Sequence, residues 1–194
     1  MKGILCGSLT AVWSGGVLYV IKRADTAHGL PERVSKMAYL LFFLAGCIVP
    51  ADTMSSALSG VMLITYLCFM AYTDHHTGQV YSFCSYGTGI TGFLILLFRH
   101  HWAVLPVLLY CIIVIALTLF KAWAPGDMEI LIAAAPFLIW RCRSPVYALG
   151  GFLLLSTAYF IPYALFICKA GMRGRSAMAP AIAAAAASIL WLSH

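Results

Sequence analysis

The chain has 194 residues, of which 63% are hydrophobic and only 9% are charged. Soluble globular domains carry about 25% charged residues, so this composition excludes an ordinary soluble domain and indicates a polytopic helical membrane protein. The formal net charge of +6 is not arranged with aromatic residues as nucleic-acid-binding surfaces require. We therefore assign this charge to membrane topology and to contact with anionic lipid.

Eight apolar segments follow one another along the chain, and we interpret each as a membrane-spanning helix. In order, they cover residues 3–21, 37–49, 54–73, 83–98, 103–123, 128–140, 146–168 and 177–193. The first segment is similar to a signal peptide, but it has no clear cleavage site and ends at Lys22 and Arg23, so we interpret it as a retained span. The sequence predicts an all-α bundle of about eight transmembrane helices, which forms one membrane-embedded domain over residues 1–194.

Charges in the loops predict the orientation of this bundle. With the N-terminus outside, most of the twelve basic residues lie in cytoplasmic loops: Lys22, Arg23, Arg33, Lys36, Lys121, Lys169, Arg173 and Arg175. The outer side then has the remaining four, Lys2, Arg99, Arg141 and Arg143. This bias follows the positive-inside rule, and both termini are predicted to lie outside.

Cysteine and histidine residues form no recognisable metal-binding pattern. The seven cysteines include no CxxC pair, and most lie in apolar segments, where a thiol behaves as a small hydrophobe. His75–His76 and His100–His101 are adjacent pairs, whereas a zinc-protease helix has histidines at i and i+4 with a glutamate between them. We expect neither a disulfide framework nor a bound metal, and no cofactor.

Two of the six acidic residues lie at ends of apolar segments. Asp74 follows Thr73 in the sequence AYTDHHTGQVYS, and Asp127 precedes Met128 in the sequence FKAWAPGDMEIL. Taken singly, Asp74 fits a solvated loop and Asp127 fits a helix N-cap. In the predicted orientation both face the cytoplasm, where two close carboxylates can share one proton and activate water.

These two segments resemble the catalytic motifs of prepilin peptidases, the integral-membrane aspartic proteases that remove the leader of type IV pilins and pseudopilins. In that family one catalytic Asp ends a transmembrane helix, as Asp74 does. The other lies in a Gly-x-Gly-Asp turn before an apolar helix, which residues 124–127 resemble. Residues 175–183 are similar to the family's late Pro-x-x-Pro stretch, and the eight-span layout agrees, so the resemblance covers most of the chain.

The chain departs from the family pattern near both aspartates. Ala124 replaces the first glycine of Gly-x-Gly-Asp, residues 80–82 replace the usual Ile-Pro, and Glu129 replaces a frequent Lys. The loop at residues 22–36 has none of the zinc-binding cysteines of longer members, so the resemblance is to a short form without that insert. Many members also N-methylate the new pilin terminus, and the resemblance leaves this activity undecided for so short a chain.

The resemblance implies an aspartic endopeptidase that cleaves the leader of a prepilin or pseudopilin within the same bilayer, at the cytoplasmic face of a bacterial inner membrane. It implies that Asp74 and Asp127 are catalytic. Gly126 and Glu129 are expected to shape the site or bind substrate, with Glu129 attracting a basic leader or serving only as a favourable acid in a first helical turn. Two alternatives stay open: a small ion- or proton-coupled transporter, and a catalytically degenerate scaffold for pilus biogenesis.

Overall fold

The computed structural model describes residues 2–24, 30–31, 34–49, 53–139, 144–163 and 178–192. These residues form eight α-helices and one short 3-10 helix, with no strand among them. The helices are α1 (Lys2–Ala24), α2 (Lys36–Cys47), α3 (Met54–Thr77), α4 (Ser82–Arg99), η1 (His101–Ala103), α5 (Val104–Leu119), α6 (Pro125–Ile139), α7 (Pro145–Pro162) and α8 (Ala179–Leu192). The all-α class predicted from the sequence is confirmed for this part of the chain.

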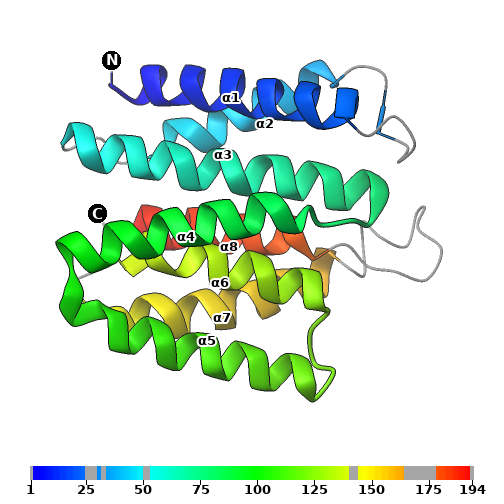
Figure 1. Ribbon diagram of the computed structural model, residues 1–194. Helices are drawn as coiled ribbons and strands as arrows, with labels where there is room; N and C mark the ends of the chain where they lie inside the picture. Colours follow the sequence, from blue (N-terminus) through cyan, green and yellow to red (C-terminus); the bar gives the residue numbers. More distant parts are fainter. Residues whose placement is uncertain are drawn as a thin grey trace.

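Successive helices run back and forth across the molecule (Figure 1). The C-terminal ends of α3, α5 and α7 therefore lie at the same end of the bundle as the N-terminal ends of α4, α6 and α8. This end is on the right in Figure 1. Because Asp74 lies near the end of α3 and Asp127 near the start of α6, the alternation brings both aspartates to one end of the bundle.

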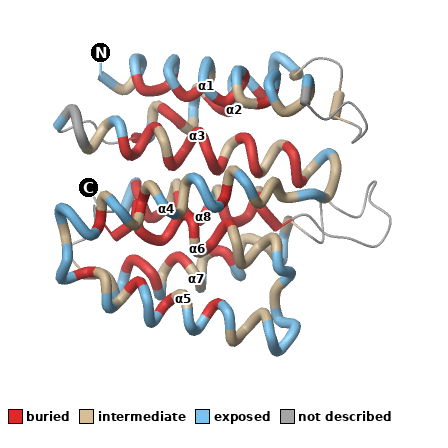
Figure 2. Tube along the Cα trace, in the orientation of Figure 1, coloured by how far each residue is buried: buried red, intermediate tan, exposed pale blue. Residues whose placement is uncertain are grey.

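Four helices are long and apolar enough to cross a membrane: Lys2–Arg23, Ser56–Thr77, His101–Leu119 and Pro145–Pro162. Helices α2 and α8 are shorter and also apolar. The outer helices α1 and α5 expose large apolar side chains such as Val12, and Figure 2 shows exposed positions along both helices. Lipid-facing helices have this character, since lipid tails and apolar side chains are chemically alike. These features support the expectation of a membrane protein.

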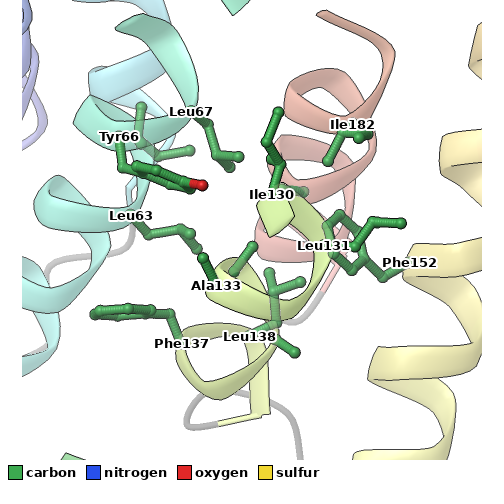
Figure 3. Packing of buried hydrophobic residues seen from close by; sticks show 14 of the residues in the cluster. Leu63, Tyr66, Leu67, Ile130, Leu131, Ala133, Phe137, Leu138, Phe152 and Ile182 are labelled. Atoms are coloured by element: carbon green, nitrogen blue, oxygen red, sulfur yellow. The ribbon is translucent and has the colours of Figure 1, made fainter. Parts of the chain in front are cut away.

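Helix α6 lies at the centre of the core. Nearly every residue from Ile130 to Ile139 is buried, and α6 contacts α3, α4, α5, α7 and α8. A helix that is apolar on all sides needs partners on all sides. Figure 3 shows Leu67 of α3, Phe152 of α7 and Ile182 of α8 packed near it. The helix is therefore packed on all sides from Ile130 onward, directly after the turn that carries Asp127.

Small residues allow the helices to approach closely. A Cβ atom added at Gly92 of α4 would lie 2.5 Å from Cε2 of Phe137 in α6. Likewise, a Cβ atom at Gly46 of α2 would lie 2.7 Å from Cβ of Thr10 in α1. Van der Waals packing drives helix association within a bilayer, and small side chains permit that packing. The glycines therefore set the spacing between these pairs of helices.

Helix α3 is one turn longer than the sequence predicts, and the extra turn contains Asp74. The sequence predicts an end at Thr73, whereas the helix continues to Thr77. Gly78 then adopts a left-handed conformation with φ of 65°, and its N–H donates to the carbonyl of Asp74 over 2.8 Å. Glycine carries no Cβ penalty in this conformation and often ends helices for that reason. Gly78, rather than the polarity of residues 74–77, sets the helix end.

Replacing Gly78 by alanine is expected to lower the free energy of unfolding by about 1 kcal/mol, because an L-residue is strained at positive φ. Thermal unfolding in detergent micelles measures the change. Gly87→Ala is the matched control: Gly87 is helical, and a Cβ atom there would meet nothing within 4 Å, so this variant is expected to be neutral or stabilised. Equal behaviour of the two variants would contradict the left-handed cap.

The end of α5 and the start of α6 also differ from the predicted helix boundaries. Helix α5 ends at Leu119 rather than at Trp123, and α6 begins at Pro125 rather than at Met128. Proline suits the first helical position, where its missing N–H has no intrahelical acceptor anyway. Between the helices Lys121 has φ of 58°, so the chain reverses sharply just before α6.

Part of the predicted seventh span, residues 164–168, lies outside the described residues. Six of the basic residues used to predict the orientation also lie outside them: Arg33, Arg141, Arg143, Lys169, Arg173 and Arg175.

Candidate active site

Asp74 lies in the last turn of α3 and is only 6% exposed, so its interpretation as a solvated loop residue is wrong. Its Oδ2 accepts a hydrogen bond from the N–H of Ala179 over 2.9 Å. Ala179 is the first residue of α8, and the first N–H groups of a helix have no acceptor within their own helix. Asp74 therefore caps α8 from a distant part of the chain, and the positive end of α8 favours negative charge on this carboxylate, which burial of the side chain opposes.

Asp127 is the third residue of α6, after Pro125 and Gly126. Its Oδ2 accepts a hydrogen bond from the N–H of Ala124 over 3.3 Å. The carbonyl of Ala124 in turn accepts the first bond of the helix, from the N–H of Met128 over 3.1 Å. Ala124 is therefore the N-cap, and Asp127 reaches back to it as the acid of a capping box does. The interpretation of Asp127 as the N-cap is therefore wrong, because the N-cap lies three residues earlier.

The pKa of Asp127 is raised from its ordinary value to about 7. Burial is the larger cause, and the negative charge of Asp74 is the second, while the N–H of Ala124 opposes both. Burial disfavours the charged form of a carboxyl group, and a nearby negative charge disfavours a second ionisation. Near neutral pH the two carboxyl groups are thus coupled, and Asp127 holds a proton for much of the time.

Gly126 lies at the contact between the two segments that carry the aspartates. A Cβ atom at Gly126 would lie 2.9 Å from Cγ2 and 3.1 Å from Cβ of Val80. Val80 belongs to the short connection between α3 and α4, just after the turn of α3 that carries Asp74. The glycine therefore lets the turn before Asp127 press against the segment after Asp74. This contact sets the spacing between the two sides of the site.

Ala124 occupies the position of the first glycine in the Gly-x-Gly-Asp pattern, yet its backbone does not require a glycine. Among the non-glycine residues that the structure describes, only Lys121 has a positive φ. Ala124 therefore adopts a conformation that any L-residue tolerates. The replacement does not by itself distort the turn.

Glu129 connects α6 to the start of α4. Its Oε1 accepts a hydrogen bond from the hydroxyl of Ser82 over 3.0 Å. Its Oε2 is buried and has no hydrogen-bond donor among the described residues. Glu129 is the fifth residue of α6, beyond the first turn, so its interpretation as a favourable first-turn acid is wrong.

These residues line one cleft of about 1030 Å³. Asp74, Asp127 and Glu129 meet there with Lys121 and Trp123, which sequence analysis alone would treat as ordinary residues of the membrane interface. The remaining wall includes Thr118, Thr157, Phe160 and Met178. Typical small-molecule sites occupy about 300–1,000 Å³, so this cleft can hold several residues of an extended peptide.

The role of the start of α8 in the site is what the sequence analysis missed. Of residues 175–183, singled out in the sequence, 175–177 lie outside the described residues, and α8 begins at Ala179 with Pro180 next. Proline in the first turn is a signal for a helix start, so the sequence could indicate this helix end. Its capping partner, Asp74, was not readable, because no local pattern links residues so far apart.

His75, at the end of α3, faces away from the cleft, and neither it nor His76 is among the described residues that line the cleft. Nδ1 of His75 lies 2.7 Å from the hydroxyl of Tyr163, and both residues line a separate apolar cavity. In the described ranges, no group of three or more His, Cys, Asp or Glu side chains is placed to hold a metal ion.

No protein-family model, curated protein or solved structure was found to match the chain. A functional conclusion therefore depends on the residues and their geometry. The cleft contains two electrostatically coupled carboxyl groups, one of them protonated near neutral pH. Such a pair can polarise a carbonyl group with its acid and deprotonate water with its base.

Proposed function

We propose that the chain is a membrane-embedded aspartic endopeptidase that cleaves the N-terminal leader of type IV prepilin-like proteins. The observation that carries this proposal is the pairing of Asp74 and Asp127 in one cleft, with the charge of Asp74 helping to raise the pKa of Asp127 to about 7. The resemblance of both segments to the prepilin peptidase motifs supplies the substrate class.

The reaction assigns a different role to each aspartate. Asp74, which accepts the N–H of Ala179 at the start of α8, takes a proton from water, and the oxygen of that water attacks the scissile carbonyl carbon. Asp127 protonates the carbonyl oxygen, which gives a neutral tetrahedral diol. As the C–N bond breaks, Asp74 gives its proton to the leaving nitrogen, and Asp127 recovers its proton from a diol hydroxyl. Both carboxyl groups thus return to their starting states.

We also propose that the bundle crosses a bacterial inner membrane eight times, with the N-terminus outside and the cleft at the cytoplasmic face. Four helices that are long and apolar enough to span a membrane support this topology. The alternating direction of successive helices supports it as well (Figure 1), since eight spans require such alternation. The excess of basic residues in the loops on the cleft side supplies the orientation.

The pattern of buried polar residues favours the peptidase over a transporter. A proton or ion pathway needs ionisable side chains within the bundle. Among the described residues, the most deeply buried polar side chains other than Asp74 are all hydroxyl-bearing: Thr10, Ser14, Ser59, Thr65, Thr73, Ser85 and Ser156. Asp127 and Glu129 are partly buried and line the cleft. The two aspartates lie together at one end of the bundle instead of along a path through it.

Leader cleavage of a co-expressed type IV prepilin tests the proposed function. We expect the native chain to shorten the pilin and the variant Asp74→Asn/Asp127→Asn to leave it unprocessed, at equal abundance of both proteins in the membrane. A panel of several prepilins guards against a mismatched substrate. Failure to cleave any of them would favour the degenerate scaffold, and cleavage by the double variant would refute the aspartate mechanism.

The cleavage rate is expected to fall about tenfold for each pH unit above about 7. Asp127 must be protonated to act as the acid, and its pKa of about 7 means that the protonated fraction declines as pH rises through this value. The measurement uses the purified chain and a prepilin in proteoliposomes, with thermal unfolding at each pH to confirm an intact fold. A flat rate between about pH 6 and pH 9 would contradict this role of Asp127.

A further inference from the structure

A second cavity lies beside the cleft, on the face formed by α4, α5 and α6. It is a groove of about 490 Å³ with an almost wholly apolar lining. Along α4 it follows one stripe at i, i+4 spacing, through Ser85, Gly89 and Phe93, and along α6 it follows Met128, Ile132 and Pro136. At a helical rise of 1.5 Å per residue, such stripes extend over about 12 Å. The groove therefore has room for about two turns of another helix.

The groove has the surface that a helix within a bilayer would need. Its outer rim includes Tyr86 and Ile90, which are 60% and 62% exposed. Gly89 and Ala133 also belong to its lining, where a Cβ atom at Gly89 would lie 3.5 Å from Cα of Ala133. This close approach belongs to the packing of α4 against α6, and the small side chains leave room above it for the side chains of a partner. The groove is open on the side where Tyr86 and Ile90 are exposed, so a helical partner can reach it from the lipid.

Among the described residues, Glu129 is the one that lines both this groove and the catalytic cleft. Of its two carboxylate oxygens, Oε1 is held by Ser82, whereas Oε2 is buried without a donor among the described residues. A buried carboxylate oxygen without a donor is costly, and a cation is its strongest partner. A cationic side chain would therefore bind favourably beside Glu129, at the junction of the two cavities.

Another apolar cavity, of about 400 Å³, lies between α2, α3 and α8. None of the described residues lines both this cavity and the catalytic cleft. A segment bound there would not continue into the cleft along a shared wall. The groove on α4, α5 and α6 is the better candidate for a substrate that must reach the aspartates.

We propose that this groove binds the transmembrane helix of the substrate, and that Glu129 pairs with a Lys or Arg in the first helical turn after the cleaved bond. This inference rests on the proposed peptidase function. The extended segment around the scissile bond lies in the cleft, the helix lies in the groove, and the cationic side chain lies at their junction. The partner is thus a single-span precursor with a basic residue next to its cleavage site, on the membrane side.

Charge exchange tests the contact with Glu129. Three prepilin reporters are compared that differ only in one residue of the first helical turn after the cleavage site, which is Lys, Gln or Glu. We expect the native chain to cleave the Lys reporter at least about tenfold faster than the Glu reporter. Glu129→Gln should remove this preference, and Glu129→Lys should reverse it. An unchanged order in both variants, or no preference by the native chain, would overturn the contact.

Photocrosslinking tests the groove itself. A photoreactive residue is introduced at Leu94, which lines the groove, or at Leu97, which lies on the same helix outside it. The two leucines are similarly exposed, 48% and 44%, so they form a matched pair. With Asp127→Asn to prevent cleavage, we expect the Lys reporter to crosslink at Leu94 and not at Leu97. Equal labelling at both positions, or labelling at Leu94 of only lipid or a second copy of the chain, would overturn the proposal.

The two experiments also separate this inference from the proposed function. If the native chain cleaves the reporters but shows neither the charge preference nor the crosslink at Leu94, the groove proposal fails and the peptidase stands. If no reporter is cleaved, the peptidase fails, and crosslinking alone then decides whether the groove binds a helix with a basic residue.

Discussion

Replacing Asp74 by asparagine is expected to reduce the rate of leader cleavage by about 10²–10⁴-fold while α8 stays capped. The amide oxygen of asparagine can still accept the N–H of Ala179, which Oδ2 of Asp74 accepts over 2.9 Å, and asparagine is among the best capping residues. The amide cannot take a proton from water, however. The variant therefore removes the base and keeps the structural contact. Cleavage of a reconstituted prepilin, with the rate normalised to folded protein, is the measurement.

Asp74→Ala separates the two roles of this residue. Alanine removes both the base and the cap. Asp74→Ala should therefore cleave as slowly as Asp74→Asn, and its free energy of unfolding should be about 1 kcal/mol lower than that of Asp74→Asn. Thermal unfolding in detergent micelles compares the two variants with the native chain. Near-native cleavage by Asp74→Asn would show that Asp74 is not the base. Equal stability of the asparagine and alanine variants would show that the bond to Ala179 contributes nothing to α8.

The helical architecture could be predicted from the sequence because it depends on local composition. The long apolar segments cannot satisfy their backbone in lipid except as helices, and each matches a helix in the described residues. The ends of these helices were less predictable. Residues 74–77 are polar and look like a loop, yet they complete α3 because Gly78 supplies the left-handed residue that ends it. A single capping glycine sets this helix end, and the hydrophobic pattern does not predict it.

The candidate site could also be predicted only in part. The two aspartates stand out in the sequence because acids are rare and both lie at the ends of apolar segments. The contacts that support the aspartates do not stand out in the sequence. Only the packed bundle brings together Ala179 with Asp74, and Gly126 with Val80. Tertiary contacts of this kind have no local signal.

Replacing Gly126 by alanine is expected to slow cleavage by about 10²-fold without a comparable loss of stability. The new Cβ atom would lie 2.9 Å from Cγ2 of Val80, whereas carbon atoms pack at roughly 3.5–4.0 Å. The turn before Asp127 must therefore move by roughly 0.6–1.1 Å relative to the segment after Asp74. A displacement of about 1 Å is enough to cost about 10²-fold in rate when two catalytic groups act together. Alanine also suits the first turn of a helix better than glycine, so the fold should persist.

A second substitution shows whether the contact with Val80 is the cause. Val80→Ala removes the nearest atom and leaves its Cβ, which is 3.1 Å from the new methyl group. The double variant Gly126→Ala/Val80→Ala should therefore cleave about tenfold faster than Gly126→Ala alone, a coupling of about 1.4 kcal/mol. Gly150→Ala is the control, because a Cβ atom there would meet nothing within 4 Å, and its rate should equal that of the native chain. If the double variant is no faster than the single one, Gly126 has some role other than setting the spacing of the two aspartates.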